Sequence, residues 1–362
     1  MNSLANIVGI DVGGANLKLA APNNAVISKP FPLWRRPDDL GKELKTLLTE
    51  HFASCHNVAL TITGELADCY RTRAEGVRRI VQQTIAATPS SAVFVYAVGG
   101  TWLEPTKLAG NELMAAASNW HCQAAWVAKR FYPQAANALL VDIGSTTVDI
   151  VPLTMGKVNT AARTDRDRLQ SGQLVYTGYE RTPVSAIVSN VLVDGECCPT
   201  MAERFADSAD AYIVLGQMQE DISDSDTADG RPKTVQNSQS RLARMVGEDT
   251  ETLEPSCIEA IAEQVAEAQS NQIVAAATNN LPLNNKPNRL DIMFTGHGSG
   301  LQHLVEFKLR VLISTNSPKT AIRFDHLSER LGTDHSRCAP SLAAAELLGE
   351  HLGVSASSCL QH

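Results

Sequence analysis

Basic residues are in the minority in this sequence, where 31 lysines and arginines stand against 39 aspartates and glutamates. The resulting net charge of -8 excludes a generic nucleic-acid or anionic-membrane surface, because both partners select a basic face. Long apolar runs are also missing: none approaches the ~20 residues that span a bilayer, and no basic start followed by an apolar stretch opens the chain. We therefore expect a cytoplasmic protein that holds any phosphate by local devices.

Paired cysteine motifs are absent as well. None of the eight cysteines stands in a C-x-x-C arrangement, and the chain is too long to need disulfide staples. A zinc site is therefore not expected, and the thiols are interpreted as reduced. Cys197 and Cys198, followed by Pro199, indicate a turn or the end of a strand.

The residues that are present have the composition of a compact protein, with 44% hydrophobic and 19% charged residues in a length that suits two domains. Runs of β-forming residues alternate with stretches whose apolar residues recur every three or four positions, which predicts an α/β protein with layered sheets. Strands are predicted at 7–10, 17–20, 58–62, 93–98, 138–143, 148–153 and 292–295. Helices are predicted at 40–51, 73–87, 111–130, 256–277 and 341–352.

One pattern occurs twice, as VGIDVGGANLKLA at 8–20 and as LLVDIGSTTVDIV at 139–151. Each copy has a strand-like run that ends in an aspartate, a glycine-rich break and a second strand-like run, which predicts a hairpin. In the first copy Asp11 ends the strand, and the glycines leave backbone N–H groups accessible to an anion. The candidate phosphate ligands of this copy are Gly13, Gly14, Asn16 and Lys18.

The second copy repeats these devices after Asp142. Its candidate phosphate ligands are Gly144, Ser145, Thr146 and Thr147. Two such hairpins facing each other across a cleft would hold a polyphosphate, with Asp11 and Asp142 binding a hydrated Mg²⁺. A tight hairpin without a ligand is the alternative for either copy alone, and the repetition favours phosphate binding. The Rossmann fingerprint is excluded because a strand follows the glycines, and Walker A is absent.

A third glycine-rich element, LDIMFTGHGSGL at 290–301, predicts a strand that leads through glycines into a helix. Glycines let the backbone lie close to a ligand at the helix N-terminus, where an anion or a polar ring is favoured. The candidate ligand-binding residues are Gly296, His297, Gly298, Ser299 and Gly300.

Two aspartate hairpins and a late glycine turn together resemble the superfamily of actin, sugar kinases and Hsp70. That resemblance implies an α/β fold of two duplicated ribonuclease-H-like domains with the ligand in the interdomain cleft. It also implies phosphates on the hairpins and an adenosine side on the glycine turn. We expect the first domain at 1–136 and the second at 137–337, with a C-terminal helix at 338–362 that packs back on the first.

Several longer strings narrow the resemblance. They are TITGELADCY at 61–70, NELMAAASNWHC at 111–122, GQLVYTGYERTPV at 172–184, TADGR at 227–231 and RLARM at 241–245. Together they resemble the hydantoinase and oxoprolinase A-type branch, and within it proteins of the tetrahydromethanopterin-linked one-carbon pathway. The resemblance implies a transferase of methanofuran-type cofactor biosynthesis. It would join an aminomethylfuran-methyl diphosphate to a phenol of the γ-glutamyltyramine or tyrosine type and release diphosphate.

A phenol with a pKa near ~10 attacks more readily beside a base or a cation. The candidate catalytic residues are Lys18, Glu65, Asp68 and Asp149. Glu65 follows Gly64 at a predicted strand end, which favours a cleft position over a surface or capping role. Asp149 could equally pair within the sheet. His121 is more typical of a histidine at the edge of a core, and His297 could be purely conformational.

Other polar and aromatic segments have two interpretations each. The mixed-charge run at 163–168 is typical of a solvated face, although one arginine could contact phosphate or an acidic acceptor. TADGR could be an exposed turn or a binding segment. The tryptophans could stack on furan or phenol rings, but such residues more often fill a core.

Two rival functions remain from the sequence. The first is an ATP-dependent kinase or a hydantoinase/oxoprolinase-type amide hydrolase, and only this rival would make ATP a cofactor. The second is a nucleotide-dependent assembly or regulatory protein. Small-molecule partners are expected for the transferase, namely the diphosphate and the phenolic acceptor, and also for the first rival. A homo-oligomer is compatible with the sequence, and no nucleic-acid or membrane partner is expected.

Overall fold

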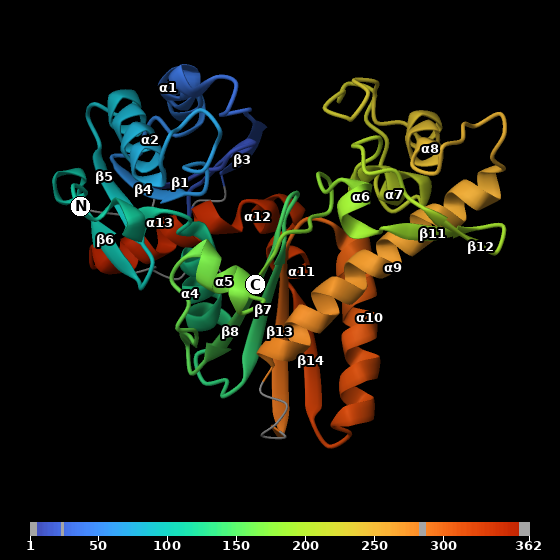
Figure 1. Ribbon diagram of the computed structural model, residues 1–362. Coiled ribbons are helices and arrows are strands. Elements are labelled where there is room, and N and C mark those ends of the chain that lie inside the picture. Colours follow the sequence, from blue (N-terminus) through green and yellow to red (C-terminus); the bar gives the residue numbers. More distant parts are fainter. Residues whose placement is uncertain (1–5, 23–24, 282–286, 355–362) are drawn as a thin grey trace. The chain divides into compact units, whose positions relative to one another are not determined.

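The computed structural model describes residues 6–22, 25–281 and 287–354, which form two compact units (Figure 1). The first unit contains the described parts of 1–140, 151–168 and 326–362, and the second contains the described parts of 141–150 and 169–325. The chain leaves the first unit at Leu140, close to the boundary expected at residue 136. Residues 151–168 return to the first unit, which a single boundary does not provide for.

The first unit is built on a six-stranded sheet with the order β3-β2-β1-β4-β5-β6. Its strands are β1 (Ile7–Val12), β2 (Asn16–Ala20), β3 (Val26–Pro30), β4 (Asn57–Ile62), β5 (Ala92–Ala97) and β6 (Thr101–Leu103). β1, β2 and β3 are antiparallel neighbours, whereas β4 runs parallel to β1 and β5 parallel to β4. β1 is buried at every position, as expected for a central strand covered on both faces.

Helices cover this sheet on both faces (Figure 1). α1 (Leu40–His51) packs against α2 (Arg73–Ala87), and its buried leucines recur at the spacing of one helical face. On the other side, α13 (Ala339–His351) packs against β1 and against α4 (Asn119–Phe131). A Cβ atom on Gly9 of β1 would lie 1.7 Å from the carbonyl oxygen of Ser341, so the contact with α13 requires glycine.

The second sheet has the order β10-β8-β7-β13-β14, with β9 paired to β8. Its strands are β7 (Ala138–Ile143), β8 (Val148–Thr154), β9 (Lys157–Val158), β10 (Leu174–Val175), β13 (Arg289–Gly296) and β14 (Ala321–His326). The chain crosses between the units within β7 and β8. The long helices α9 (Pro255–Asn280) and α10 (Ser299–Asn316) pack against each other beside this sheet (Figure 1).

A smaller hydrophobic core surrounds the N-terminal part of α9 (Figure 1). The elements around it are α6 (Val184–Ile187), α7 (Ser208–Val214), α8 (Val235–Arg244), β11 (Asn190–Val193) and β12 (Glu196–Pro199). The remaining short elements are η2 (Pro37–Asp39), η3 (Pro105–Lys107), α3 (Glu112–Ala115), α5 (Asp165–Gln170), α11 (Leu327–Leu331) and α12 (Thr333–Arg337).

The two sheets repeat one strand order. Counting outward from the hairpin, β3-β2-β1-β4-β5 corresponds to β10-β8-β7-β13-β14, with the first sheet extended by β6. In both sheets the first two strands of the repeat form the hairpin. A later strand, β4 in the first sheet and β13 in the second, pairs with the other edge of the first hairpin strand. The duplication and the α/β class expected from the sequence are confirmed.

Each predicted strand overlaps an observed one, but the predicted helix at 111–130 is wrong as a single helix. α3 ends at Ala115 and α4 begins at Asn119. Between them Ala117 has φ 46°, which a right-handed helix cannot contain. The Ser118 N–H donates to the Ile62 carbonyl (3.0 Å), so pairing with the end of β4 replaces helical hydrogen bonds at this point.

Within the described residues no helix combines the length and apolar character that a bilayer crossing requires. The described cysteines form no disulfide. Cys197 and Cys198 lie in β12, which ends at Pro199, as the sequence indicated.

Candidate active site

The first acidic hairpin lies at the centre of the first sheet. Asp11 is 3% exposed, and its Oδ1 accepts a hydrogen bond from the Thr61 hydroxyl of β4 (3.1 Å). The turn is closed by the Gly13 N–H, which donates to the Asn16 carbonyl (3.0 Å). Lys18 is directly opposite Asp11 in the β1–β2 register, so the two side chains project from the same face of the sheet. This face therefore carries a carboxylate and an ammonium group side by side.

The second hairpin has the same construction. The Gly144 N–H donates to the Thr147 carbonyl (2.9 Å), and the Asp142 Oδ1 accepts from the Thr295 hydroxyl of β13 (2.6 Å). Asp149 follows Asp142 by seven residues, as Lys18 follows Asp11, so it occupies the equivalent position on the returning strand. The duplication thus extends to equivalent side-chain contacts, because in each unit a threonine on the neighbouring strand orients the aspartate of the hairpin.

The glycine turn at 296–300 packs against the second hairpin. The His297 N–H donates to the Ile143 carbonyl (3.1 Å). Gly296 has φ 84°, and a Cβ atom there would lie 2.2 Å from the same carbonyl oxygen, so both its conformation and its contact require glycine. Gly298 caps α10, which begins at Ser299 and includes Gly300. The strand, turn and helix expected here are confirmed, and the structure brings the turn together with the hairpin.

Glu65 is the most deeply buried of the predicted catalytic carboxyl groups. It follows the end of β4, is 1% exposed, and has one carboxyl oxygen, Oε2, without a hydrogen-bond partner among the described residues. Burial raises the pKa of Glu65 to about 7, and the charge of Asp165 adds to the rise. Hydrogen bonds from its own backbone and from Ala117 oppose it. A carboxyl group with a pKa near neutrality is suited to take and return a proton.

The other predicted acid–base residues have different surroundings. Asp68 is exposed on the loop after β4, and Asp149 is buried in β8 opposite Leu174. His121 is buried in α4 with its Nδ1 2.9 Å from the Tyr96 hydroxyl. Burial lowers the pKa of His121 to about 4, with a further contribution from Arg163, so the ring is neutral near pH 7. A structural histidine, the alternative weighed from the sequence, fits this environment.

The mixed-charge run is not wholly solvated. Arg168 is buried, with its guanidinium 4.3 Å from the centre of the Trp120 ring and its Nη1 3.5 Å from Asp165. Asp167 accepts hydrogen bonds from the Arg163 and Thr164 N–H groups at the start of α5. Trp120 and Trp126 belong to the core, as the more common outcome for such residues suggested.

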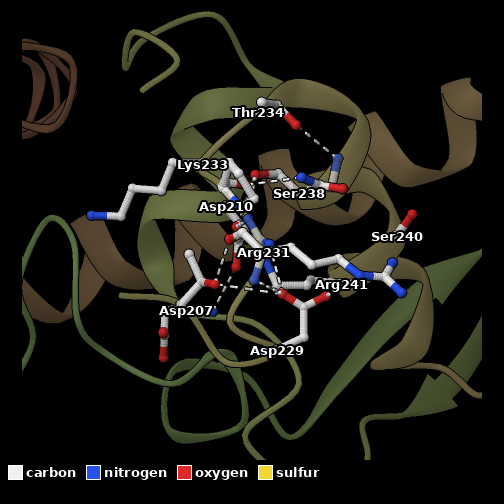
Figure 2. A network of polar contacts seen from close by, with 12 residues as sticks. Asp207, Asp210, Asp229, Arg231, Lys233, Thr234, Ser238, Ser240 and Arg241 are labelled. Carbon is white, nitrogen blue, oxygen red and sulfur yellow. Dashed lines mark hydrogen bonds and ion pairs between the residues drawn. The ribbon is translucent and has the colours of Figure 1, made fainter. Parts of the chain in front are cut away.

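The TADGR and RLARM strings form one ion-pair network (Figure 2). The Arg241 guanidinium is fully buried and contacts Asp210 of α7 (2.6 Å) and Asp229 of the loop before α8 (3.0 Å). Asp229 also pairs with Arg244 (3.2 Å). Asp229 therefore ties its loop to α8.

Three polar residues beside the second hairpin were not identified from the sequence. The Glu180 carboxylate contacts the His297 ring (2.6 Å) and Lys233 (3.8 Å), and Arg181 follows Glu180. Glu180 and Arg181 stand within the string GQLVYTGYERTPV, which was the available signal. No sequence pattern marked Lys233, because its position depends on how the loop before α8 folds.

Each of the two sheets has a hairpin whose aspartate accepts a hydrogen bond from a threonine, and the two sheets share one strand order. This is the duplicated α/β architecture that the resemblance to actin, sugar kinases and Hsp70 implies. The model of the hydantoinase/oxoprolinase family matches residues 56–320, and the chain belongs to that family.

Two curated archaeal relatives share the name (4-{4-[2-(gamma-L-glutamylamino)ethyl]phenoxymethyl}furan-2-yl)methanamine synthase. The protein from Methanocaldococcus jannaschii is 33% identical over 352 residues, which cover 96% of this chain and 98% of the relative. The protein from Methanococcus vannielii is 28% identical over 219 residues, 60% of this chain and 93% of the relative. Among solved structures, nucleotide-free acetone carboxylase is similar with a TM-score of 0.49 and 10% identity, over 94% of this chain and 70% of that chain.

Proposed function

We propose that this protein is a transferase of methanofuran-type cofactor biosynthesis that joins an aminomethylfuran-methyl diphosphate to a γ-glutamyltyramine- or tyrosine-like phenol. The observation that carries the proposal is the 33% identity, over nearly the whole of both chains, to a synthase whose name describes a phenoxymethyl furan. The two acidic hairpins supply what such a reaction needs, namely groups that hold a charged leaving group.

The reaction exchanges one carbon–oxygen bond for another. The bond between the furan-methyl carbon and the diphosphate oxygen breaks, and diphosphate leaves with the electron pair. The phenol oxygen forms the new bond to that carbon, and its proton passes to a base. Because the electron-rich furan stabilises positive charge on the methyl carbon, the enzyme mainly neutralises the leaving group and orients the phenol.

We assign the base to Glu65. The pKa of its buried carboxyl group is about 7. This value is closer to the pKa of a phenol than the pKa of an exposed carboxyl group is. Oε2 accepts no hydrogen bond from the described protein residues, so its protonation would break no internal contact. Because this atom is buried, the phenol would reach it only after neighbouring side chains move. Lys18, beside Asp11 on the same face, serves as a fixed positive charge for phosphate oxygens.

The aspartates of the hairpins suit Mg²⁺, which proteins bind through one or two carboxylates together with waters and substrate phosphates. Asp11 and Asp142 are each oriented by a threonine hydroxyl, so their carboxylates are fixed before any ligand binds. When bound, the ion would neutralise charge on the diphosphate. The glycines and hydroxyl residues of each turn would contribute N–H and O–H donors to a phosphate group.

An ATP-dependent hydrolase or kinase is the second candidate. The observation that favours it is that the matching family is named after hydantoinase and oxoprolinase. Calorimetric titration with Mg²⁺–ATP and Mg²⁺–diphosphate separates the two. Tight ATP binding with substrate-triggered ADP release supports the second candidate.

We also propose a cytoplasmic location, in keeping with described cysteines that form no disulfide.

The test of the transferase is a reconstituted reaction. Purified full-length protein is incubated with Mg²⁺, the aminomethylfuran-methyl diphosphate and either γ-glutamyltyramine or tyrosine, and diphosphate and the aryl ether are measured. We expect both products in equal amounts. Absence of diphosphate release with every phenolic acceptor would overturn the proposal.

A further inference from the structure

The segment after β10 packs directly on the turn of the second hairpin. The Glu180 and Arg181 N–H groups both donate to the Ser145 carbonyl (3.1 and 2.9 Å), and the Tyr179 N–H donates to the Gly144 carbonyl (3.0 Å). The side chains of Glu180 and Arg181 therefore originate next to the proposed phosphate-binding turn. The glycine turn reaches the same place, because His297 contacts the Glu180 carboxylate.

Basic side chains gather here, and acidic residues of the loop 221–233 hold two of them. Lys233 is 13% exposed, and its Nζ lies 2.6 Å from Asp224 and 3.8 Å from Glu180. The Arg181 Nη1 lies 3.2 Å from Asp226. Asp226 is 58% exposed, and an ion pair with so exposed a carboxylate is weak. A ligand with greater negative charge can therefore displace Asp226 from Arg181. The same competition applies at Lys233 to Asp224, which is 34% exposed.

Backbone hydrogen bonds within the loop also hold Lys233 in place. The Asp221 N–H donates to the Lys233 carbonyl (2.8 Å), and the Lys233 N–H donates to the Asp224 carbonyl (3.0 Å). The same loop is attached to α8 through Asp229 and the buried Arg241 (Figure 2). The network of the TADGR and RLARM strings thus positions a lysine near the hairpin.

We propose that Arg181 and Lys233 bind the diphosphate leaving group, exchanging Asp226 and Asp224 for its oxygens. This inference rests on the proposed function. A guanidinium matches two phosphate oxygens at once, and an ammonium adds a compact charge. In a protein of net charge -8, such local cations attract a polyanion, and the loop carboxylates balance them before it arrives.

The test is equilibrium binding of inorganic diphosphate with Mg²⁺, measured by calorimetry on the full-length protein. Arg181→Gln and Lys233→Gln should each raise Kd by about tenfold or more, as expected for loss of a charge-assisted hydrogen bond. Arg231→Gln is the matched control: it removes a cation from the same loop, its side chain is exposed, and it lies 4.0 Å from Asp229. Its Kd should remain within about twofold of wild type.

A second variant gives the opposite sign, which misfolding cannot produce. Asp226→Asn removes the carboxylate that competes for Arg181, so it should lower Kd by about two- to fivefold. If wild type binds diphosphate but Arg181→Gln and Lys233→Gln bind it as tightly as Arg231→Gln, the inference is wrong while the proposed function stands. If wild type itself does not bind diphosphate, the failure belongs to the proposed function.

Discussion

At the scale of single residues, Glu65 links burial to chemistry. Its carboxylate form is the base, so kcat/KM should rise with pH through the pKa of about 7 and then level off. Glu65→Gln keeps the shape of the side chain but cannot take a proton, and it should lower kcat by about 10²–10⁴ and remove the step near pH 7. Glu104→Gln, at an exposed position, is the control. An unchanged pH profile in Glu65→Gln would show that another group is the base.

The same residue makes stability depend on pH. The pKa of Glu65 is raised above its ordinary value of 4.5, so the folded state binds this proton more tightly than the unfolded state. The resulting stabilisation is fully present below pH 4.5 and is lost as pH rises through about 7. Relative to Glu65→Gln, wild type should therefore lose on the order of 3 kcal/mol between pH 4.5 and pH 8. Denaturant unfolding at both pH values measures this, and a difference that does not change with pH would contradict it.

At the scale of elements, the buried ion pair between α7 and α8 can be broken selectively. Asp210→Asn leaves the Arg241 guanidinium buried without its nearest carboxylate, which should cost about 3–5 kcal/mol of unfolding free energy. Arg244→Gln removes a partly exposed partner of Asp229 from the same network and should cost less than about 1 kcal/mol. Equal effects in urea unfolding would mean that burial does not decide the strength of this network.

The contact between β1 and α13 offers a second test at this scale. Gly9→Ala places a methyl group against the Ser341 carbonyl, and two backbones must separate to admit it, so at least about 1–3 kcal/mol should be lost. Gly14→Ala is the matched control for stability, because no atom lies within 4 Å of its added Cβ. Similar unfolding midpoints for the two variants would show that α13 is not seated as described.

At the scale of the whole molecule, the features that could be predicted from the sequence are those that depend on residues close together in the chain. The repeated aspartate–glycine string predicted both hairpins, and the leucine spacing of α1 predicted its buried face. Contacts between distant segments decided the rest. The break at Ala117 depends on Ser118 pairing with Ile62, and the same loop contributes a backbone hydrogen bond to Glu65. The position of Lys233 depends on the ion pair between Asp229 and Arg241, which cannot be predicted from either residue alone.

The duplication of the hairpin allows a test that involves both repeats. If each threonine-held carboxylate serves the same Mg²⁺–diphosphate substrate, Asp11→Asn and Asp142→Asn should each lower turnover by about 10²-fold or more and raise the Mg²⁺ concentration needed for half-maximal rate. Chelation of Mg²⁺ should abolish wild-type turnover. Thr61→Val and Thr295→Val keep both carboxylates but remove the hydroxyls that orient them, so smaller losses of similar size are expected. If only one of the two aspartate variants lost activity, and the other kept the wild-type rate and Mg²⁺ dependence, only one repeat would have retained the function.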